Sequence, residues 1–404
     1  MKRLFFLTLM LMSACSSPAA VTPASFFDGS VVAPTPAFGT TPETQIPTPQ
    51  SFTLATQPSI TGFAAETGEL YFFLQPRQGG GKIELVKVSA ACITDPLNCP
   101  PLEKIAVPFD FNFTINALAW SRDGRYAAFS YSANPNGTPT QLWLFNAEAG
   151  TWKAIAEFPY IDPPFWSPDG AWIAFRTQNG YGSEDVFIVR PDGSGLQSIS
   201  AHLPEAGRPY IMDGWYTENV IIRSALPGAD GNIYLVRAAN GQVRPMFETL
   251  LIRAQFIASP DAGFFAYDDY NSASQDHFIK VMEPDSANAV TIAQFTGGSI
   301  YPMVWSPDSS LIAFNYYGSM TNGNPTTEVF VIRRTGGDLK SVYKGNTVGR
   351  LLFSPNSKYL LIEETTSASG GHLFLVDLAT TNVGILQAPG LSTDYDWYAP
   401  SWRP

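Results

Sequence analysis

The strongest constraint on the fold is a short motif that recurs along the chain. Residues 164–175 read Pro-Phe-Trp-Ser-Pro-Asp-Gly-Ala-Trp-Ile-Ala-Phe, in which a turn separates two apolar runs. Pro168 presets φ for the second position of a tight turn, the Asp169 side chain accepts turn hydrogen bonds, and Gly170 takes a positive φ. The motif therefore predicts a hairpin between two buried strands.

Related segments recur at nearly constant spacing. Taking the residue two before the turn proline, or its equivalent, as a marker gives Trp120, Trp166, Trp215, Ala258, Trp305, Phe353 and Trp402. Their separations are 46, 49, 43, 47, 48 and 49 residues, and four short apolar runs fit into each interval. A period in the forties with four strands per unit is typical of a β-propeller. We therefore predict an all-β propeller of four-stranded antiparallel blades.

The two ends of the repeat region predict how the ring closes. Residues 68–74 and 82–88 supply the second and third strands of a first unit, and the chain ends on an extra inner-strand segment at 398–402. A ring closes well when its last strand completes the first blade, because this removes an open sheet edge. We predict seven blades within residues 59–404, closed by the C-terminal strand, with six or eight blades as the alternatives.

The repeats resemble those of the TolB-like propellers, which belong to the WD-like repeat class and also occur in relatives of prolyl oligopeptidase. The resemblance covers roughly residues 59–404 and implies a fold that hosts unrelated activities. Two features depart from these families. Residues 16–60 are too short and too rich in proline to be the α/β domain that precedes the propeller of TolB. No Gly-x-Ser-x-Gly nucleophile elbow of a hydrolase domain occurs in this sequence.

The first residues predict export and a lipid anchor. Lys2 and Arg3 precede an apolar run at 4–12, which is too short to span a bilayer and is typical of a secretory signal. The following Met-Ser-Ala-Cys tetrad resembles the bacterial lipobox, which implies a signal peptide at 1–14 and a lipid on Cys15. An ordinary cleavable signal is the alternative. We expect an extracytoplasmic protein held on a bacterial membrane, at the cell surface or in the periplasm.

Residues 15–58 are predicted to be a tether between the lipid and the propeller. Ser, Thr and Pro account for 17 of the 35 residues from 16 to 50, and no Lys or Arg occurs there. Such a segment cannot bury enough apolar surface to offset the entropy of ordering it.

Charge and cysteine content narrow the chemistry. The net charge of −11 is opposite to that required for nucleic-acid binding. Cys92 and Cys99 flank a six-residue segment with a proline, which predicts a disulfide in an oxidising compartment. The three histidines, at 202, 277 and 372, belong to different units without the close spacing of metal ligands, so we predict neither a metal nor another cofactor.

The connections between strands predict which face binds a ligand. Second-to-third loops at 131–140, 267–276 and 316–327 are long, and fourth-to-first connections are rich in aromatic residues. Both types emerge at the same end of an up-and-down blade, and aromatic rings offer apolar area with a polar tip. The predicted binding residues are Tyr131, Tyr160, Tyr210, Tyr301, Tyr316, Trp397 and Tyr398.

The predicted function is that of a monomeric binding module for a protein or glycan of the bacterial cell envelope. The alternative is an envelope hydrolase or lyase, acting on polysaccharide or peptide, with its site on the long-loop face. The carboxylate clusters Asp268-Asp269, Glu363-Glu364 and Asp394 with Asp396 are the residues with which such an enzyme would bind a cation or act as acid and base, but solvated charge at loops and strand ends is the favoured interpretation of each. We assign no catalytic residue.

Overall fold

The computed structural model describes residues 68–76, 82–89, 100–109, 114–115, 118–133, 139–178, 184–204, 209–224, 231–250, 252–284, 286, 288–318, 327–345, 347–364, 372–385 and 395–404. For strand residues 75–76, 114, 178, 231, 247–250, 252–255 and 395–398 it describes the backbone only. The chain divides into two units, Met1–Leu54 and Ala55–Pro404, and every described residue lies in the second unit.

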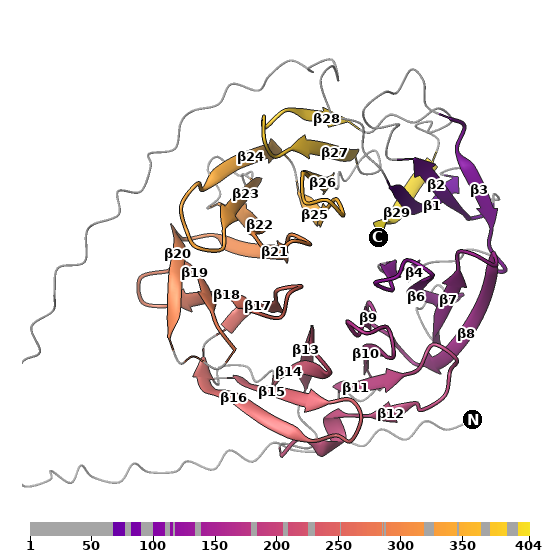
Figure 1. The fold of residues 1–404 in the computed structure, drawn as a ribbon, viewed down its shortest axis with the longest axis horizontal. Helices are drawn as coiled ribbons and strands as arrows, with labels where there is room; N and C mark the ends of the chain where they lie inside the picture. Colours follow the sequence, from indigo (N-terminus) through magenta and orange to yellow (C-terminus); the bar gives the residue numbers. More distant parts are fainter. Residues whose placement is uncertain are drawn as a thin grey trace, which may run out of the picture. The chain divides into compact units, whose positions relative to one another are not determined.

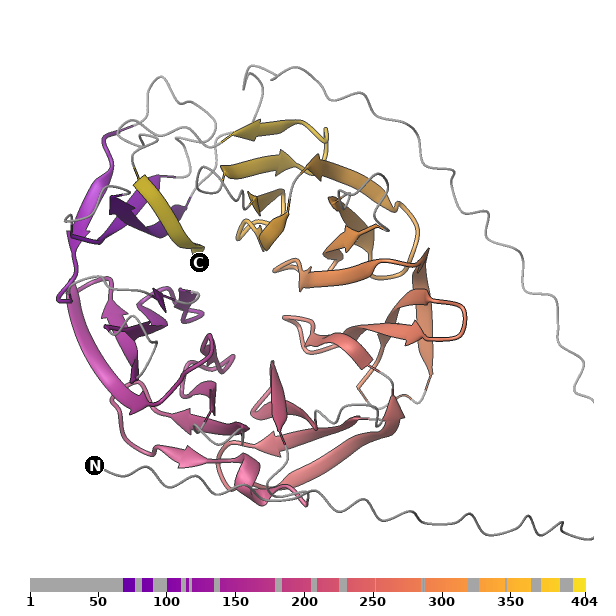
Figure 2. The same ribbon diagram turned by 180° about the vertical axis from the view of Figure 1, so that it is seen from behind.

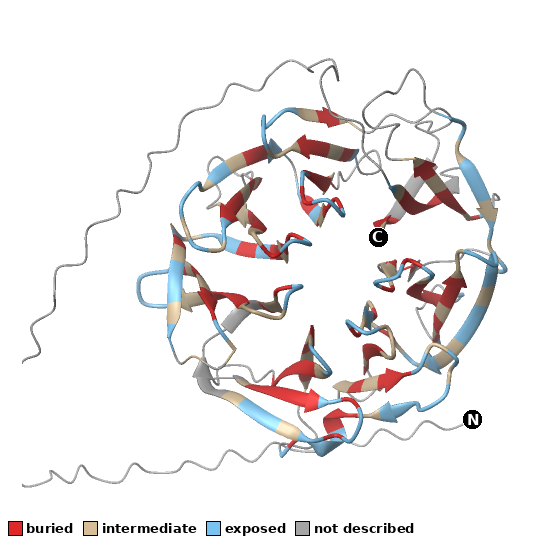
Figure 3. Ribbon diagram, in the orientation of Figure 1, coloured by how far each residue is buried: buried red, intermediate tan, exposed pale blue. Residues whose placement is uncertain are grey.

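Seven antiparallel sheets stand around a ring, as Figure 1 and the view from behind in Figure 2 show. The prediction of a seven-bladed propeller is therefore confirmed. Figure 3 shows buried residues concentrated in the middle strands of the blades and exposed residues on the outermost strands. The core is accordingly a set of apolar clusters, most of which join residues of two adjacent blades.

The strands of blades 2 to 4 follow the chain order, whereas the innermost strand of blade 1 comes from the C-terminal residues. Blade 1 contains β1 (Glu69–Pro76), β2 (Glu84–Ser89) and β3 (Glu103–Ala106), with β29 (Tyr395–Arg403) innermost. Blade 2 contains β4 (Thr114–Ile115) and β5 (Ala119–Trp120), which both pair with β6 (Tyr126–Ser132), then β7 (Thr140–Asn146) and β8 (Thr151–Phe158). Blade 3 contains β9 (Phe165–Trp166), β10 (Ile173–Gln178), β11 (Glu184–Val189) and β12 (Gln197–Ser198), followed by the 3₁₀ helix η2 (Ser200–His202). Blade 4 contains β13 (Tyr210–Tyr216), β14 (Asn219–Ser224), β15 (Gly231–Arg237) and β16 (Val243–Leu250).

The remaining three blades repeat the same order. Blade 5 contains β17 (Ile252–Ala258), β18 (Phe265–Asn271), β19 (Asp276–Met282) and β20 (Ala289–Thr296). Blade 6 contains β21 (Ser299–Trp305), β22 (Leu311–Tyr317), β23 (Thr327–Arg333) and β24 (Lys340–Gly345). Blade 7 contains β25 (Val348–Phe353), β26 (Tyr359–Glu364), β27 (His372–Asp377) and β28 (Val383–Ile385).

The C-terminal strand closes the ring as predicted. β29 pairs antiparallel with β1 and places Trp402 opposite Leu70. Arg403 reinforces the closure on both sides, because its Nη1 donates to Glu69 Oε2 at 2.9 Å and its Nε donates to the carbonyl of Gly124 in blade 2 at 2.8 Å. The last residues therefore join blade 1 to blade 2.

The recurring turn is held by its own side chains. Ser167 Oγ donates to Asp169 Oδ1 at 2.6 Å and accepts the N–H of Trp172 at 2.9 Å, while Gly170 has φ of 70°. The turns that begin at Ser121, Ser259, Ser306 and Ser354 repeat the serine contacts. The side-chain contacts that hold each turn thus come from residues of the same motif.

Two of these turns also bind the turn of the preceding blade. Ser309 and Ser357 occupy the positive-φ position of Gly170, with φ of 60° each. Ser309 Oγ accepts the N–H of Asp261 at 3.0 Å, and Ser357 Oγ accepts the N–H of Asp308 at 3.1 Å. Each hydrogen bond offsets part of the strain of a left-handed non-glycine residue.

The marker tryptophans pack between blades, as predicted, and also bond across the interface. Trp215 and Trp305 are buried. The indole N–H groups of Trp166, Trp215 and Trp305 donate to the carbonyls of Ala119, Phe165 and Ile257, the residues before the preceding markers, at 2.9, 3.0 and 3.2 Å. Among the described residues no such partner meets the indole nitrogens of Trp120 and Trp402.

Antiparallel pairing gives the ring two distinct faces. First-to-second and third-to-fourth turns emerge on one face, called here the short-turn face, and the other connections emerge on the long-loop face. One predicted long loop is wrong. β18 continues to Asn271 and β19 begins at Asp276, so only residues 272–275 connect them. Asp268 and Asp269 consequently lie within a strand, because sheet pairing prevails over their low strand propensity.

Candidate functional site

One position of the second strands is polar in six successive blades. In each second strand, one residue pairs with the marker of the first strand, and the polar position lies three residues after it. In blade 3, for instance, Ile173 pairs with Trp166, and the polar residue is Arg176. The same register gives the six members that we call the polar belt: Ser130, Arg176, Arg223, Asp268, Asn315 and Glu363. Blade 1 has Phe73 there. Neighbours one and three residues earlier in each strand are apolar, so the belt is a polar layer at the long-loop end of the core.

The belt arginines are held by carboxylates. Arg176 Nε donates to Asp162 Oδ2, and its Nη1 donates to Glu184 Oε2 at 2.8 Å and to the carbonyl of Tyr210 at 3.5 Å. Burial lowers the pKa of Arg176, but the hydrogen bond and charge of Asp162 more than offset this and raise it. Arg176 therefore fixes the connections on both sides of blade 3.

Arg223 forms a more buried ion pair in blade 4. Its Nε and Nη2 donate to the two carboxylate oxygens of Asp213, the second at 2.9 Å. Burial raises the pKa of Asp213, and the Arg223 guanidinium opposes that rise. Asp213 lies at a bulge in β13, which turns the carboxylate toward the arginine.

In blade 5 the belt member Asp268 pairs with a histidine of the next strand. His277 Nδ1 lies 2.7 Å from Asp268 Oδ2, and its Nε2 lies 3.2 Å from the carbonyl of Gly298 in the connection to blade 6. Both side chains are buried. Burial raises the pKa of Asp268, against the hydrogen bond from His277. Since both ring nitrogens are occupied, His277 is not placed to accept a proton from a substrate.

The belt members of blades 6 and 7 also contact the first strands of their blades. Asn315 Nδ2 donates to the carbonyl of Tyr301 at 3.1 Å, and Arg350 Nε lies 3.5 Å from Glu363 Oε2. Burial raises the pKa of Glu363, and the charge of Arg350 opposes it. Ser130 Oγ and Asn315 Oδ1 are buried without a hydrogen-bond partner among the described residues, which is suited to ordered water. Asn315 and Glu363 thus contact the first strands of their own blades, at the Tyr301 carbonyl in β21 and the Arg350 side chain in β25.

The fourth-to-first connections and the strand starts that follow them carry three of the predicted binding tyrosines. Tyr301 presents its ring to solvent with 57% of its surface exposed, at the start of β21. Tyr160 is partly buried and lies close enough to Arg176 for their charges to interact. The ring of Tyr210 is instead 1% exposed, within the core between blades 3 and 4. Only Tyr160 and Tyr301 of this group therefore have rings within reach of a ligand.

The remaining predicted aromatics differ in accessibility. Tyr316 is partly buried and donates its hydroxyl to the carbonyl of Thr296 at 3.1 Å. Tyr131 is 3% exposed and packs on Phe109 with ring centroids 4.2 Å apart, so it belongs to the core. Trp397 and Tyr398 lie in β29, but their side chains are outside the described residues.

The cysteines and histidines add no cluster. Cys15, Cys92 and Cys99 lie outside the described residues, so the lipid anchor and the disulfide stay predictions. His277 and His372 begin their strands at the long-loop end, whereas His202 packs on Gly241 in a third-to-fourth turn. Within the described ranges no three His, Cys, Asp or Glu residues are grouped to hold a metal ion. In the same ranges no helix is long and apolar enough to cross a membrane.

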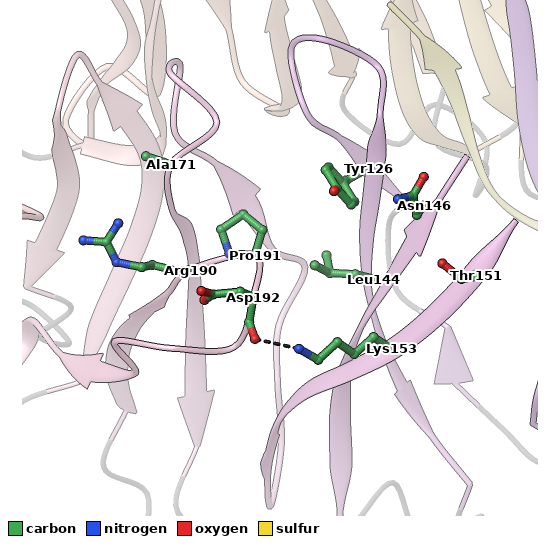
Figure 4. A pocket seen from close by; sticks show the side chains of 9 residues that line it. All are labelled: Tyr126, Leu144, Asn146, Thr151, Lys153, Ala171, Arg190, Pro191 and Asp192. Carbon is green, nitrogen blue, oxygen red and sulfur yellow. Dashed lines mark hydrogen bonds between the residues drawn. The ribbon is translucent and has the colours of Figure 1, made fainter. Parts of the chain in front are cut away.

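A pocket of about 550 Å³ lies on the opposite, short-turn face between blades 2 and 3 (Figure 4). Its lining residues come from both blades: Tyr126, Leu144, Asn146, Thr151, Lys153, Ala171, Arg190, Pro191 and Asp192. Lys153 Nζ spans the interface and donates to the carbonyl of Asp192 at 2.6 Å. Arg190 is held 4.3 Å from the centre of the Trp172 ring.

Sequence reasoning missed both the belt and this pocket. The belt had a usable signal, because in five blades its member is the ninth residue after the turn serine, as Ser130 follows Ser121. The pocket had none, because it forms where two blades meet and its residues are spread over sequence positions 126–192.

Comparison with known proteins supports the fold. No family model matches the chain. A curated relative, the uncharacterized peptidase YuxL of Bacillus subtilis (strain 168), is 23% identical over 168 residues, which are 40% of this chain and 23% of that protein. The chain thus spans less than a quarter of that relative.

Solved structures of several proteins have a fold similar to that of this chain. A prolyl endopeptidase aligns with a TM-score of 0.59 at 12% identity, over 80% of this chain and 49% of its own. The β-propeller domain of the Trilobed protease from Pyrococcus furiosus gives 0.55 at 14% identity, over 80% and 94%. TolB from Acinetobacter baumannii gives 0.51 at 15% identity, over 83% and 67%. The chain has the propeller fold found in TolB and in these peptidases.

Proposed function

We propose that the protein is a membrane-anchored, extracytoplasmic binding module of the bacterial cell envelope. Its ligand is a protein or glycan of the envelope, bound on the long-loop face, and Cys15 carries the lipid. The observation that carries the proposal is the contact by which the belt residue Asn315 holds the start of β21. Asn315 holds the Tyr301 backbone while leaving the ring exposed, so this aromatic contact is preorganised.

The contacts of His277 support a binding role for this face. The buried Asp268–His277 pair is the arrangement most similar to an acid–base pair, yet His277 Nε2 faces the Gly298 carbonyl and not a nucleophile. Similarity to peptidases keeps hydrolysis as the second candidate function. Hydrolysis of peptide or polysaccharide substrates by the purified chain, abolished by His277→Gln with the fold intact, would favour that candidate instead.

The binding role is tested by cross-linking at a single exposed ring. A photoreactive phenylalanine analogue at Tyr301 should form an adduct with an envelope protein or glycan in intact cells, and Tyr301→Ala should weaken binding of that ligand. The matched control is Leu196, which is 44% exposed and belongs to a third-to-fourth turn on the other face. Adducts at position 196 but not at 301 would contradict the proposed face.

The anchor is tested separately. Cys15→Ser should move the protein from the membrane fraction to the soluble fraction after export. If the variant stays with membranes after a high-salt wash, Cys15 is not the anchor.

A further inference from the structure

We propose that the pocket between blades 2 and 3 binds a neutral saccharide. The site lies on the short-turn face, so it is distinct from the face to which the proposed function assigns the envelope ligand. Its volume of about 550 Å³ falls within the range of small-molecule sites, about 300–1,000 Å³.

The polar groups around the pocket include both hydrogen-bond donors and acceptors, which suits the hydroxyl groups of a sugar. Asn146 Oδ1 accepts the N–H groups of Glu148 and Ala149 at 3.0 Å each, and among the described residues no partner takes the amide donor, which is left for a ligand. Thr151 both donates and accepts, and Lys153 adds charged donors. The Asp192 carboxylate accepts, and the hydrogen bonds from Ser194 keep its pKa below the ordinary value, so it is ionised at neutral pH. A sugar ring carries groups that suit all four side chains.

The charges argue against a charged ligand. Lys153 and Asp192 come from facing blades and carry opposite charges. The guanidinium of Arg190 lies over the Trp172 ring, and Figure 4 shows it directed away from Lys153. The lining therefore has two positive groups, Lys153 and Arg190, and one negative group, Asp192, and Arg190 is held against the Trp172 ring. A ligand with a net charge of either sign would therefore meet at least one lining group that repels it.

The apolar part of the lining supplies a surface for the C–H face of a sugar. The ring of Tyr126 is partly exposed and is backed by Trp166, with centroids 6.4 Å apart at 28°. Pro191 continues this surface beside it, whereas Leu144 is buried and adds little to it. Aromatic rings with polar groups at their margin present the combination that pyranoses require.

The position of the polar groups is fixed before a ligand arrives. Lys153 is bound across the interface to the Asp192 carbonyl, and Asp192 Oδ1 accepts the N–H of Ser194 at 2.8 Å. A second pocket of about 450 Å³, on blade 5, differs because its Lys280 is neutralised by an ion pair with Asp269. The Lys153 side chain, in contrast, forms no ion pair within the described part of the chain.

The test is titration calorimetry of the purified protein with glucose, galactose, N-acetylglucosamine and their β-linked disaccharides. Glucuronate and inorganic phosphate serve as anionic probes. We expect at least one neutral sugar to bind with a dissociation constant in the millimolar range or tighter. Lys153→Met and Asp192→Asn should each weaken that binding at least tenfold.

Lys340→Met is the matched control. Lys340 pairs with Val331 in blade 6 as Lys153 pairs with Leu144 in blade 2, and it lies outside the pocket. Its substitution should leave affinity unchanged, and equal melting temperatures of the variants would show that all are folded. Absence of binding by every neutral sugar, tighter binding of glucuronate or phosphate, or a sugar that binds Lys153→Met normally would overturn the proposal. None of these outcomes bears on cross-linking at Tyr301.

Discussion

Removing Arg223 should destabilise the propeller more than its position near the long-loop face suggests. The side chains of Arg223 and Asp213 are 10% and 3% exposed, and both nitrogens of the contact are used. Arg223→Met keeps most of the stem that packs in the core but leaves the Asp213 carboxylate without its cation. Breaking a buried pair in this way costs about 3–5 kcal/mol in the free energy of unfolding.

The charge left behind should make this loss dependent on pH. Burial already raises the pKa of Asp213 above its ordinary value of 3.8, and loss of the opposing guanidinium raises it further. A group whose pKa is higher in the folded state contributes most stability below its unfolded pKa, and this contribution is lost as pH rises through the folded pKa. The deficit of Arg223→Met relative to wild type should therefore grow from pH 4 toward neutrality.

The assay is urea unfolding followed by tryptophan fluorescence at several pH values. The double variant Asp213→Asn with Arg223→Met removes the buried charge as well as its partner, so it should recover at least half of the stability lost. A loss below about 1 kcal/mol, which is the scale of exposed ion pairs, would refute the argument. So would a deficit that is equal at every pH, or a double variant as unstable as the single one.

Three further predictions concern the ring. Deletion of residues 395–404 should abolish cooperative thermal unfolding, because β1 and the neighbouring blades lose the closing strand and Arg403; a normal melting curve would contradict this. Trp305→Phe should cost about 1 kcal/mol more than Trp402→Phe in denaturant unfolding, because Trp305 Nε1 bonds the Ile257 carbonyl whereas Trp402 Nε1 meets no partner among the described residues. Burial raises the pKa of Asp268 in the folded protein, so the free energy of unfolding should fall as pH rises through this raised pKa. Asp268→Asn should remove this fall from the pH profile of the melting temperature. An unaltered profile would show that Asp268 is not the cause of the fall.

The fold was predictable because each blade is specified by contacts within a few residues. The turn that begins at Ser167 is held by Asp169 and Trp172, and these contacts recur wherever the motif recurs. Closure was also predictable, because a segment equivalent to the inner strands follows the last complete blade and pairs with β1. Local chemistry and repeat length together leave few other arrangements.

The candidate site was less predictable because the exposure of each aromatic ring depends on which side chains from other segments cover it. Tyr131 and Tyr301 both flank loops in the sequence, yet Phe109 covers Tyr131 while nothing among the described residues buries the ring of Tyr301. Phe109 precedes the second blade and is not part of the repeat. The accessibility of a loop-flanking tyrosine is therefore set by contacts that the repeat pattern does not contain.

The polar belt explains how a repetitive scaffold can present a surface that is not repetitive. Its members occupy one backbone position but differ in type, and two of them, Arg176 and Asn315, contact the carbonyls of Tyr210 and Tyr301 at the starts of β13 and β21. A backbone contact fixes the path of a connection without restricting its side chains. The rings on these connections can then vary from blade to blade while the ring stays closed. Recognition on the long-loop face is therefore expected to depend on single side chains such as Tyr301, and its rigidity on the belt beneath them.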